Sequence, residues 1–139
     1  MRIVTLELDA DPPEPCDIEV PLQRLACSPE PLVSVRWHKL LDLVEVLRAD
    51  GPHPVAWGHI LGDELLLSPG NPVNRVTVRV RVDWQDFSPL RHGLPEMHYR
   101  LQIQRRGAKL SRDARAPSPE EVERIIREAF GWSSSRLGQ

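Results

Sequence analysis

Hydrophobic and polar residues alternate without a break in the stretch VTVRVRVDW, residues 76–84. Because side chains two residues apart point to the same face of a β-strand, this alternation predicts a strand with one buried and one solvated face. The polar face carries Arg79 and Arg81. A register shift of one residue would bury both guanidinium groups at a large desolvation cost, so we expect the valines to point into the core and the arginines into solvent.

Four further segments are predicted to be strands. Residues 2–8 and 97–105 alternate in the same way, and residues 55–61 and 64–67 flank a Gly-Asp turn that is typical of a β-hairpin. The strand with the arginines is expected to extend over residues 73–84. Because consecutive strands commonly pair, we expect residues 97–105 to be its antiparallel partner.

Two segments, 35–49 and 119–130, repeat apolar residues at three- and four-residue spacings, which predicts amphipathic helices. In the first helix we place Ser34 as the N-cap and Gly51 as a left-handed C-terminal cap. The second begins with SPEE, which combines an N-cap serine, a proline at the first helical position and a capping-box carboxylate. We therefore expect the second helix to start at this proline.

These elements predict an α+β fold, with a mainly antiparallel sheet of about five strands and two amphipathic helices packed on one of its faces. A chain of 139 residues has the size of one domain, which we expect to span residues 1–139 with a frayed tail at 132–139. Residues 16–31 have a weak pattern that fits either a short strand or a helical turn. Residues 107–116 are basic and irregular, and no strand is predicted there.

Charge is unevenly distributed along the chain. The whole sequence has 18 Lys and Arg against 20 Asp and Glu, but residues 1–33 hold 2 basic and 7 acidic groups, and residues 65–116 hold 10 basic and 4 acidic groups. The near-neutral total argues against a global electrostatic attraction to nucleic acid. The uneven distribution predicts either an electrically polarised molecule or one whose two ends pair internally.

The sequence lacks the local motifs of common catalytic and nucleotide-binding sites: GxSxG, GxxxxGK[ST] and GxGxxG are all absent. Cys16 and Cys27 match neither a zinc arm nor a dense disulfide framework. Two pairs of histidines stand six residues apart, but each pair has a member in a Pro- or Gly-rich loop and is not held rigidly as a metal site requires. These pairs are His53 with His59 and His92 with His98. We expect no catalytic residue, no metal site and no cofactor.

The N-terminal stretch has no long apolar segment of the kind found in a signal peptide, and no run approaches the roughly 20 apolar residues of a membrane span. We expect a cytoplasmic protein that does not bind membranes. Only two of the basic residues are lysines and 14 residues are prolines. This bias is typical of a GC-rich genome, of a thermophilic source, or of both.

An arginine-rich sheet face is the remaining candidate site. It could be a solvated face neutralised by the acidic N-terminal third of the chain, a surface for nucleic-acid phosphates, or a surface for an acidic protein. No aromatic residues are interleaved with the arginines, as stacking on single strands would require, and the near-neutral charge favours a protein partner. The candidate protein-binding residues are Arg75, Arg79, Arg81, Arg100, Arg105 and Arg106.

The acidic opening MRIVTLELDADPPEP, the small size, the arginine and proline bias and the lack of catalytic groups resemble small phage-encoded regulators that bind host RNA polymerase in hot-environment bacteria. The resemblance implies a non-enzymatic regulator in the host cytoplasm. Its partner would be the polymerase flap or the sigma subunit, and it would inhibit or redirect transcription. A nucleic-acid-binding module is the first alternative, and a small metal-dependent hydrolase or nuclease using His92, Glu96 and His98 is the second.

Overall fold

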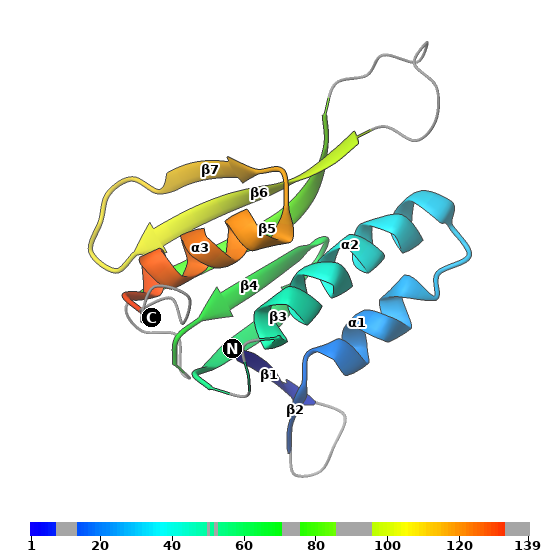
Figure 1. Ribbon diagram of the computed structural model, residues 1–139, viewed down its shortest axis with the longest axis horizontal. Coiled ribbons are helices and arrows are strands. Elements are labelled where there is room, and N and C mark those ends of the chain that lie inside the picture. Colours follow the sequence, from blue (N-terminus) through cyan, green and yellow to red (C-terminus); the bar gives the residue numbers. More distant parts are fainter. Residues whose placement is uncertain (8–13, 50, 52, 71–75, 86–95, 133–139) are drawn as a thin grey trace.

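The computed structural model describes residues 1–7, 14–49, 51, 53–70, 76–85 and 96–132. These residues form an α+β fold in which three helices pack on one mixed sheet of seven strands, in the order β2-β1-β3-β4-β5-β6-β7 (Figure 1). The strands are β1 (Arg2–Glu7), β2 (Glu14–Asp17), β3 (Val55–Leu61), β4 (Glu64–Ser68), β5 (Val76–Gln85), β6 (Glu96–Arg105) and β7 (Arg112–Ala116). The helices are α1 (Glu19–Ala26), α2 (Pro31–Arg48) and α3 (Pro119–Phe130).

Strands β3 to β7 form an antiparallel meander that includes every strand predicted after residue 50. The β3–β4 hairpin turns at Gly62, whose φ of 60° lies in the left-handed region that favours glycine. Strands β5 and β6 pair over their whole length, from Val76 opposite Arg105 to Gln85 opposite Glu96. The predicted partnership of the arginine strand is therefore confirmed.

The sheet differs from the prediction in two respects. It contains two more strands than expected, and it is mixed, because β1 runs parallel to β3 with Arg2 opposite Val55. The β2–α1–α2 segment between these strands supplies the crossover that a parallel pair needs. Both extra strands, β2 and β7, are short and lie at the sheet edges. An edge strand tolerates the proline of β2, Pro15, and the charged residues of β7. These residues hide the alternating pattern by which a strand is predicted.

The helices also differ from the prediction. Helix α1 is a third helix, and Pro21 is tolerated in its first turn because the amide N–H groups there need no partner within the helix. Helix α2 begins at Pro31 and not at residue 35. Ser34 is therefore not its N-cap: its hydroxyl donates instead to the carbonyl of Ala26 at 2.6 Å and ties α2 to α1. Gly51 has a φ of 106°, as the predicted left-handed position requires.

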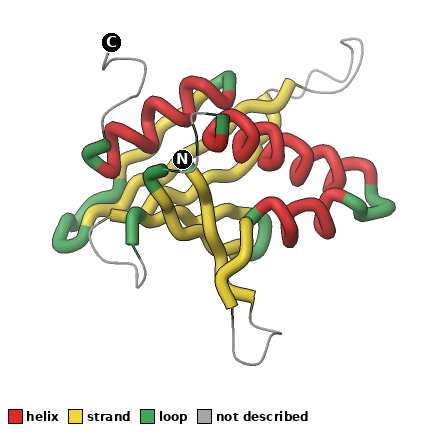
Figure 2. The backbone as a smooth tube through the Cα atoms, turned by 60° about the horizontal axis from the view of Figure 1, so that its bottom comes forward, coloured by secondary structure: helices red, strands yellow, loops and turns green. Residues whose placement is uncertain are grey.

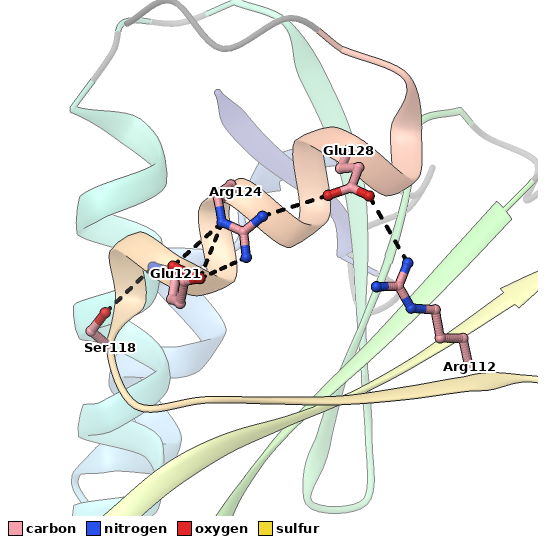
Figure 3. Close-up of polar contacts among 5 residues, drawn as sticks. All are labelled: Arg112, Ser118, Glu121, Arg124 and Glu128. Atoms are coloured by element: carbon pink, nitrogen blue, oxygen red, sulfur yellow. Dashed lines mark hydrogen bonds and ion pairs between the residues drawn. The ribbon is translucent and has the colours of Figure 1, made fainter. Parts of the chain in front are cut away.

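The start of α3 matches the prediction. The hydroxyl of Ser118 accepts a hydrogen bond from the Glu121 N–H at 3.4 Å, and Gly131 ends the helix with a φ of 73°. The carboxylate of Glu121 accepts hydrogen bonds from Arg124, and these hold the pKa of that carboxyl below its usual range. Arg124 also faces Glu128, which in turn reaches Arg112 on β7 (Figure 3). Of the predicted frayed tail, residues 133–139 lie outside the described residues.

One hydrophobic core fills the space between the helices and the sheet, with all three helices on one side of the strands (Figure 2). The β5 valines point into this core, as predicted. The hydroxyl of Tyr99 on β6 crosses the core and donates to the carbonyl of Lys39 in α2. The largest fully buried side chains are Tyr99, Met1, Ile18, Leu22, Leu40, Leu43, Leu47, Leu65, Leu67, Leu101, Ile126 and Val78.

Candidate functional site

The side of the sheet opposite the helices, here called the open face, is the candidate site. The helices cover the face to which Val78 and Val80 point, so the alternating residues of the same strand, Arg79 and Arg81, project from the open face. Their side chains are 51% and 37% exposed. The outward placement of these two arginines, predicted from alternation, is confirmed.

Three arginines stand side by side on the open face. Arg81 on β5 lies opposite Arg100 on β6, and Arg100 lies opposite Arg115 on β7. We call these three residues the arginine row. Strands in a sheet are about 4.8 Å apart, and like charges directly opposite one another across strands are destabilising. The row therefore concentrates positive charge on a part of the sheet that no described helix covers.

Acidic residues of the sheet itself partly neutralise this face. Asp83 Oδ2 lies 3.4 Å from Arg81 Nη2 and 3.5 Å from Arg100 Nη1. Glu64 Oε2 on β4 lies 3.9 Å from Arg79 Nη1. These distances exceed the roughly 2.7–2.9 Å of a strong charge-assisted hydrogen bond. Neutralisation by the acidic first third of the chain was one of the alternatives from the sequence, but among the described residues the acids paired with these arginines come from β4 and β5.

A shallow hollow of about 150 Å³ lies among these side chains. Acidic groups stand on its rim as well as arginines, and the hollow therefore combines donors with acceptors. It is lined by Glu64, Arg79, Arg81, Arg100, Leu101, Gln102 and Asp113.

The other candidate arginines do not join this group. Arg105 lies opposite Val76 in the register, which puts it in phase with the core-facing residues of β6, and it lines a separate small hollow beside α3. Arg106 is exposed in the turn after β6. Arg75 lies outside the described residues. The structure thus brings together Arg79, Arg81 and Arg100 of the predicted set and adds Arg115, which was not in that set.

The open face also has an apolar half that the sequence did not indicate. Trp57 on β3 lies half-buried beside Val4 of β1 and opposite Ser68 of β4. Trp57 is not interleaved with the arginines, because β4 lies between its strand β3 and the arginine-bearing β5. The structure places Gly58 on the core side, because a Cβ atom there would sit 2.8 Å from Ile3 Cγ2, and its neighbour Trp57 therefore faces the other way.

The two halves of the open face meet along one line of cross-strand neighbours. Leu66 on β4 pairs with His59 on one side and with Arg79 on the other, and Arg79 pairs with Gln102, which pairs with Asp113. The line runs across five strands, from His59 and Leu66 at one end to Arg79, Gln102 and Asp113 at the other. The open face is therefore a continuous surface of mixed character.

A larger groove of about 490 Å³ opens beside the apolar half, where β1 and β3 diverge beyond the pair Val4 and Trp57. Helix α1 forms one wall and the ends of β3 and β4 form the other. Val20 and Leu61, on opposite walls, are 41% and 48% exposed. The groove is lined by Thr5, Leu6, Cys16, Val20, Pro21, Arg24, His59, Ile60, Leu61 and Leu66.

The residues of the predicted hydrolase alternative are placed only in part. His98 is buried opposite Asp83, and neither of its ring nitrogens has a hydrogen-bond partner among the described residues. His92 and the side chain of Glu96 lie outside what the structure describes. Within the described ranges no three His, Cys, Asp or Glu side chains gather as metal ligands would, and Cys16 and Cys27 are not joined in a disulfide.

None of the helices in the described part of the chain has the length and apolar character needed to cross a membrane. No protein-family model, curated protein or solved structure matches the sequence or the fold of this chain.

Proposed function

We propose that this chain is a non-catalytic regulatory protein that docks on a larger protein through the open face of its sheet. The observation that carries the proposal is the line of neighbours from His59 and Leu66 to Arg79, which places the apolar half that contains Trp57 beside the charged half that contains the arginine row. Protein interfaces are enriched in Trp and Arg and place an apolar centre beside a polar rim. The open face has this composition.

Direct nucleic-acid binding is the second candidate, and the arginine row favours it. Guanidinium groups bind phosphates in bidentate geometry. Against it, Glu64, Asp83 and Asp113 are interleaved with the arginines on the same face and would repel a phosphate backbone. A face with both positive and negative charges is better matched by a protein surface, on which carboxylates and basic groups also alternate.

RNA polymerase is our first expected partner, because the sequence resembles small phage regulators of that enzyme. The test uses purified bacterial RNA polymerase, with and without its sigma subunit, and the double variant Arg79→Glu, Arg81→Glu. We expect the variant to lose binding at a nearly unchanged thermal midpoint, because charge reversal on an exposed face turns attraction into repulsion.

The matched control is Arg105→Glu, Arg106→Glu, which makes the same charge change at the end of β6 and in the turn after it, outside the arginine row. If both double variants bind equally well, or lose binding equally, the open face is not the docking surface. Retention of the wild-type protein on DNA or RNA, with a steep loss on adding salt, would favour the nucleic-acid alternative.

A further inference from the structure

The three guanidinium groups of the arginine row have more hydrogen-bonding capacity than the described part of the chain uses. Each guanidinium has five N–H donors. Within the described part of the chain, Asp83 Oδ2 bridges Arg81 and Arg100, and Arg115 is exposed and makes no ion pair. Like charges on neighbouring strands lower the stability of the fold, and the long ion pairs that Asp83 makes offset little of this cost.

From this arrangement we propose that the arginine row recognises a carboxylate side chain on an acidic segment of the protein partner. This inference rests on the proposed docking function and names the chemistry of the partner. The incoming carboxylate takes over the position between Arg81 and Arg100 that Asp83 occupies at 3.4 and 3.5 Å. Arg115, next in line, provides a third cation for the same segment.

The chain itself indicates why the ligand is a carboxylate. Asp83 occupies the position that we assign to the partner carboxylate. One of its oxygens, Oδ2, is shared by two guanidinium groups, at distances longer than those of a strong bidentate pair. A partner carboxylate that approaches from solvent is not restrained by the backbone of β5. It can therefore align both of its oxygens with one guanidinium plane.

The surrounding charges favour isolated carboxylates over a polyphosphate. Glu64 and Asp113 line the same hollow as Arg81 and Arg100. Duplex DNA has one charge about every 1.7 Å along its axis, so phosphates that contact the row would also approach these acids. A protein segment can place a carboxylate at the row and leave the positions beside Glu64 and Asp113 to neutral or basic groups.

The test measures binding of fluorescein-labelled hexaglutamate by fluorescence polarisation, with hexaglutamine and hexathymidylate as comparison probes. We expect hexaglutamate to bind and hexaglutamine not to bind. Arg81→Gln, Arg100→Gln should weaken binding about tenfold or more, whereas Arg105→Gln, Arg106→Gln, which removes the same charge elsewhere, should have a much smaller effect.

Asp83→Asn is the decisive variant, because it removes the internal competitor. It should tighten hexaglutamate binding severalfold, beyond the effect of Glu45→Gln, which adds the same charge to an exposed position on α2. No gain in Asp83→Asn over Glu45→Gln would overturn the inference, as would equal losses in the two arginine double variants. Tighter binding of hexathymidylate than of hexaglutamate would also overturn it, in favour of phosphate.

The inference and the proposed docking function can fail separately. Loss of polymerase binding in Arg79→Glu, Arg81→Glu, together with no hexaglutamate binding, leaves docking standing and removes the carboxylate proposal. The opposite outcome is hexaglutamate binding that depends on the arginine row, with polymerase binding that the open-face variants do not change. That outcome supports the carboxylate site and excludes RNA polymerase as the partner of the open face.

Discussion

The hydroxyl of Tyr99 donates a hydrogen bond to the backbone carbonyl of Lys39 at 2.6 Å, and thereby links β6 to α2 across the core. Burial raises the pKa of this phenol well above its ordinary value, with a further contribution from the negative charges of Asp42 and Glu120. The sheet that carries the arginine row is therefore joined to the helical layer by a hydrogen bond as well as by apolar packing.

Replacing Tyr99 by Phe removes this hydrogen bond and keeps the ring. We expect the free energy of unfolding to fall by about 1 kcal/mol, the usual net contribution of such a bond. Urea unfolding at neutral pH, followed by tryptophan fluorescence, measures the change. A variant as stable as the parent would show that the Tyr99–Lys39 bond contributes no net stability.

The same residue predicts a loss of stability in alkali. Below pH 10 the phenol is protonated in both the folded and the unfolded chain, so its contribution is fully present. Above the ordinary tyrosine pKa of about 10 the unfolded chain loses the proton and the folded chain keeps it, so stability falls as pH rises. Tyr99 is the only tyrosine, so tyrosinate absorbance reports it alone. We expect the folded protein to titrate at a higher pH than the urea-unfolded protein, and the alkaline loss to be smaller in Tyr99→Phe.

Gly58 provides a test of which side of β3 faces the core. An alanine Cβ would lie 2.8 Å from Ile3 Cγ2 and 3.3 Å from Leu67 Cδ2, so Gly58→Ala overpacks the core. Overpacking of this kind costs about 1–3 kcal/mol. Thermal or urea unfolding measures the loss. A neutral substitution would mean that Gly58 does not face the core, and Trp57 would then not lie on the open face.

Burial of His98 without a hydrogen-bond partner in the described ranges predicts that an apolar residue is tolerated in its place. Buried polar groups with no partner lose their hydration without compensation, at a cost of about 1–3 kcal/mol. We therefore expect His98→Phe to be at least as stable as the parent protein at neutral pH. Metal analysis of the purified parent protein belongs to the same experiment, because stoichiometric metal that disappears in this variant would favour the hydrolase alternative.

The elements that could be predicted from the sequence are those whose pattern is local. The β5 and β6 strands alternate because one of their faces is buried and the other is wet, and SPEE marks the start of α3 through groups within one helical turn. Strand β7, with the sequence RDARA, has no such contrast because it is a short edge strand. The parallel pairing of β1 with β3 depends on residues about 50 positions apart, which no local pattern encodes.

The candidate site was predictable to the same extent. Alternation placed Arg79 and Arg81 on the open face, but Arg115 belongs to the strand that the pattern did not indicate. The acids that approach the arginines could not be assigned either, because Glu64 reaches Arg79 from another strand and Asp83 depends on side-chain geometry. The direction in which side chains point is encoded locally, whereas their neighbours across strands follow from the register.

Trp57 should be the principal apolar anchor of the open face. A few aromatic residues commonly dominate a protein interface, and truncating such a residue to alanine costs about 2 kcal/mol or more. We therefore expect Trp57→Ala to weaken polymerase capture by about tenfold or more. Leu110→Ala is the control, because Leu110 is 86% exposed in the turn between β6 and β7, away from Trp57. Binding is compared at a temperature at which circular dichroism shows both variants folded. If Trp57→Ala and Leu110→Ala bind alike, the apolar half of the open face takes no part in docking, and the arginine row would have to act alone.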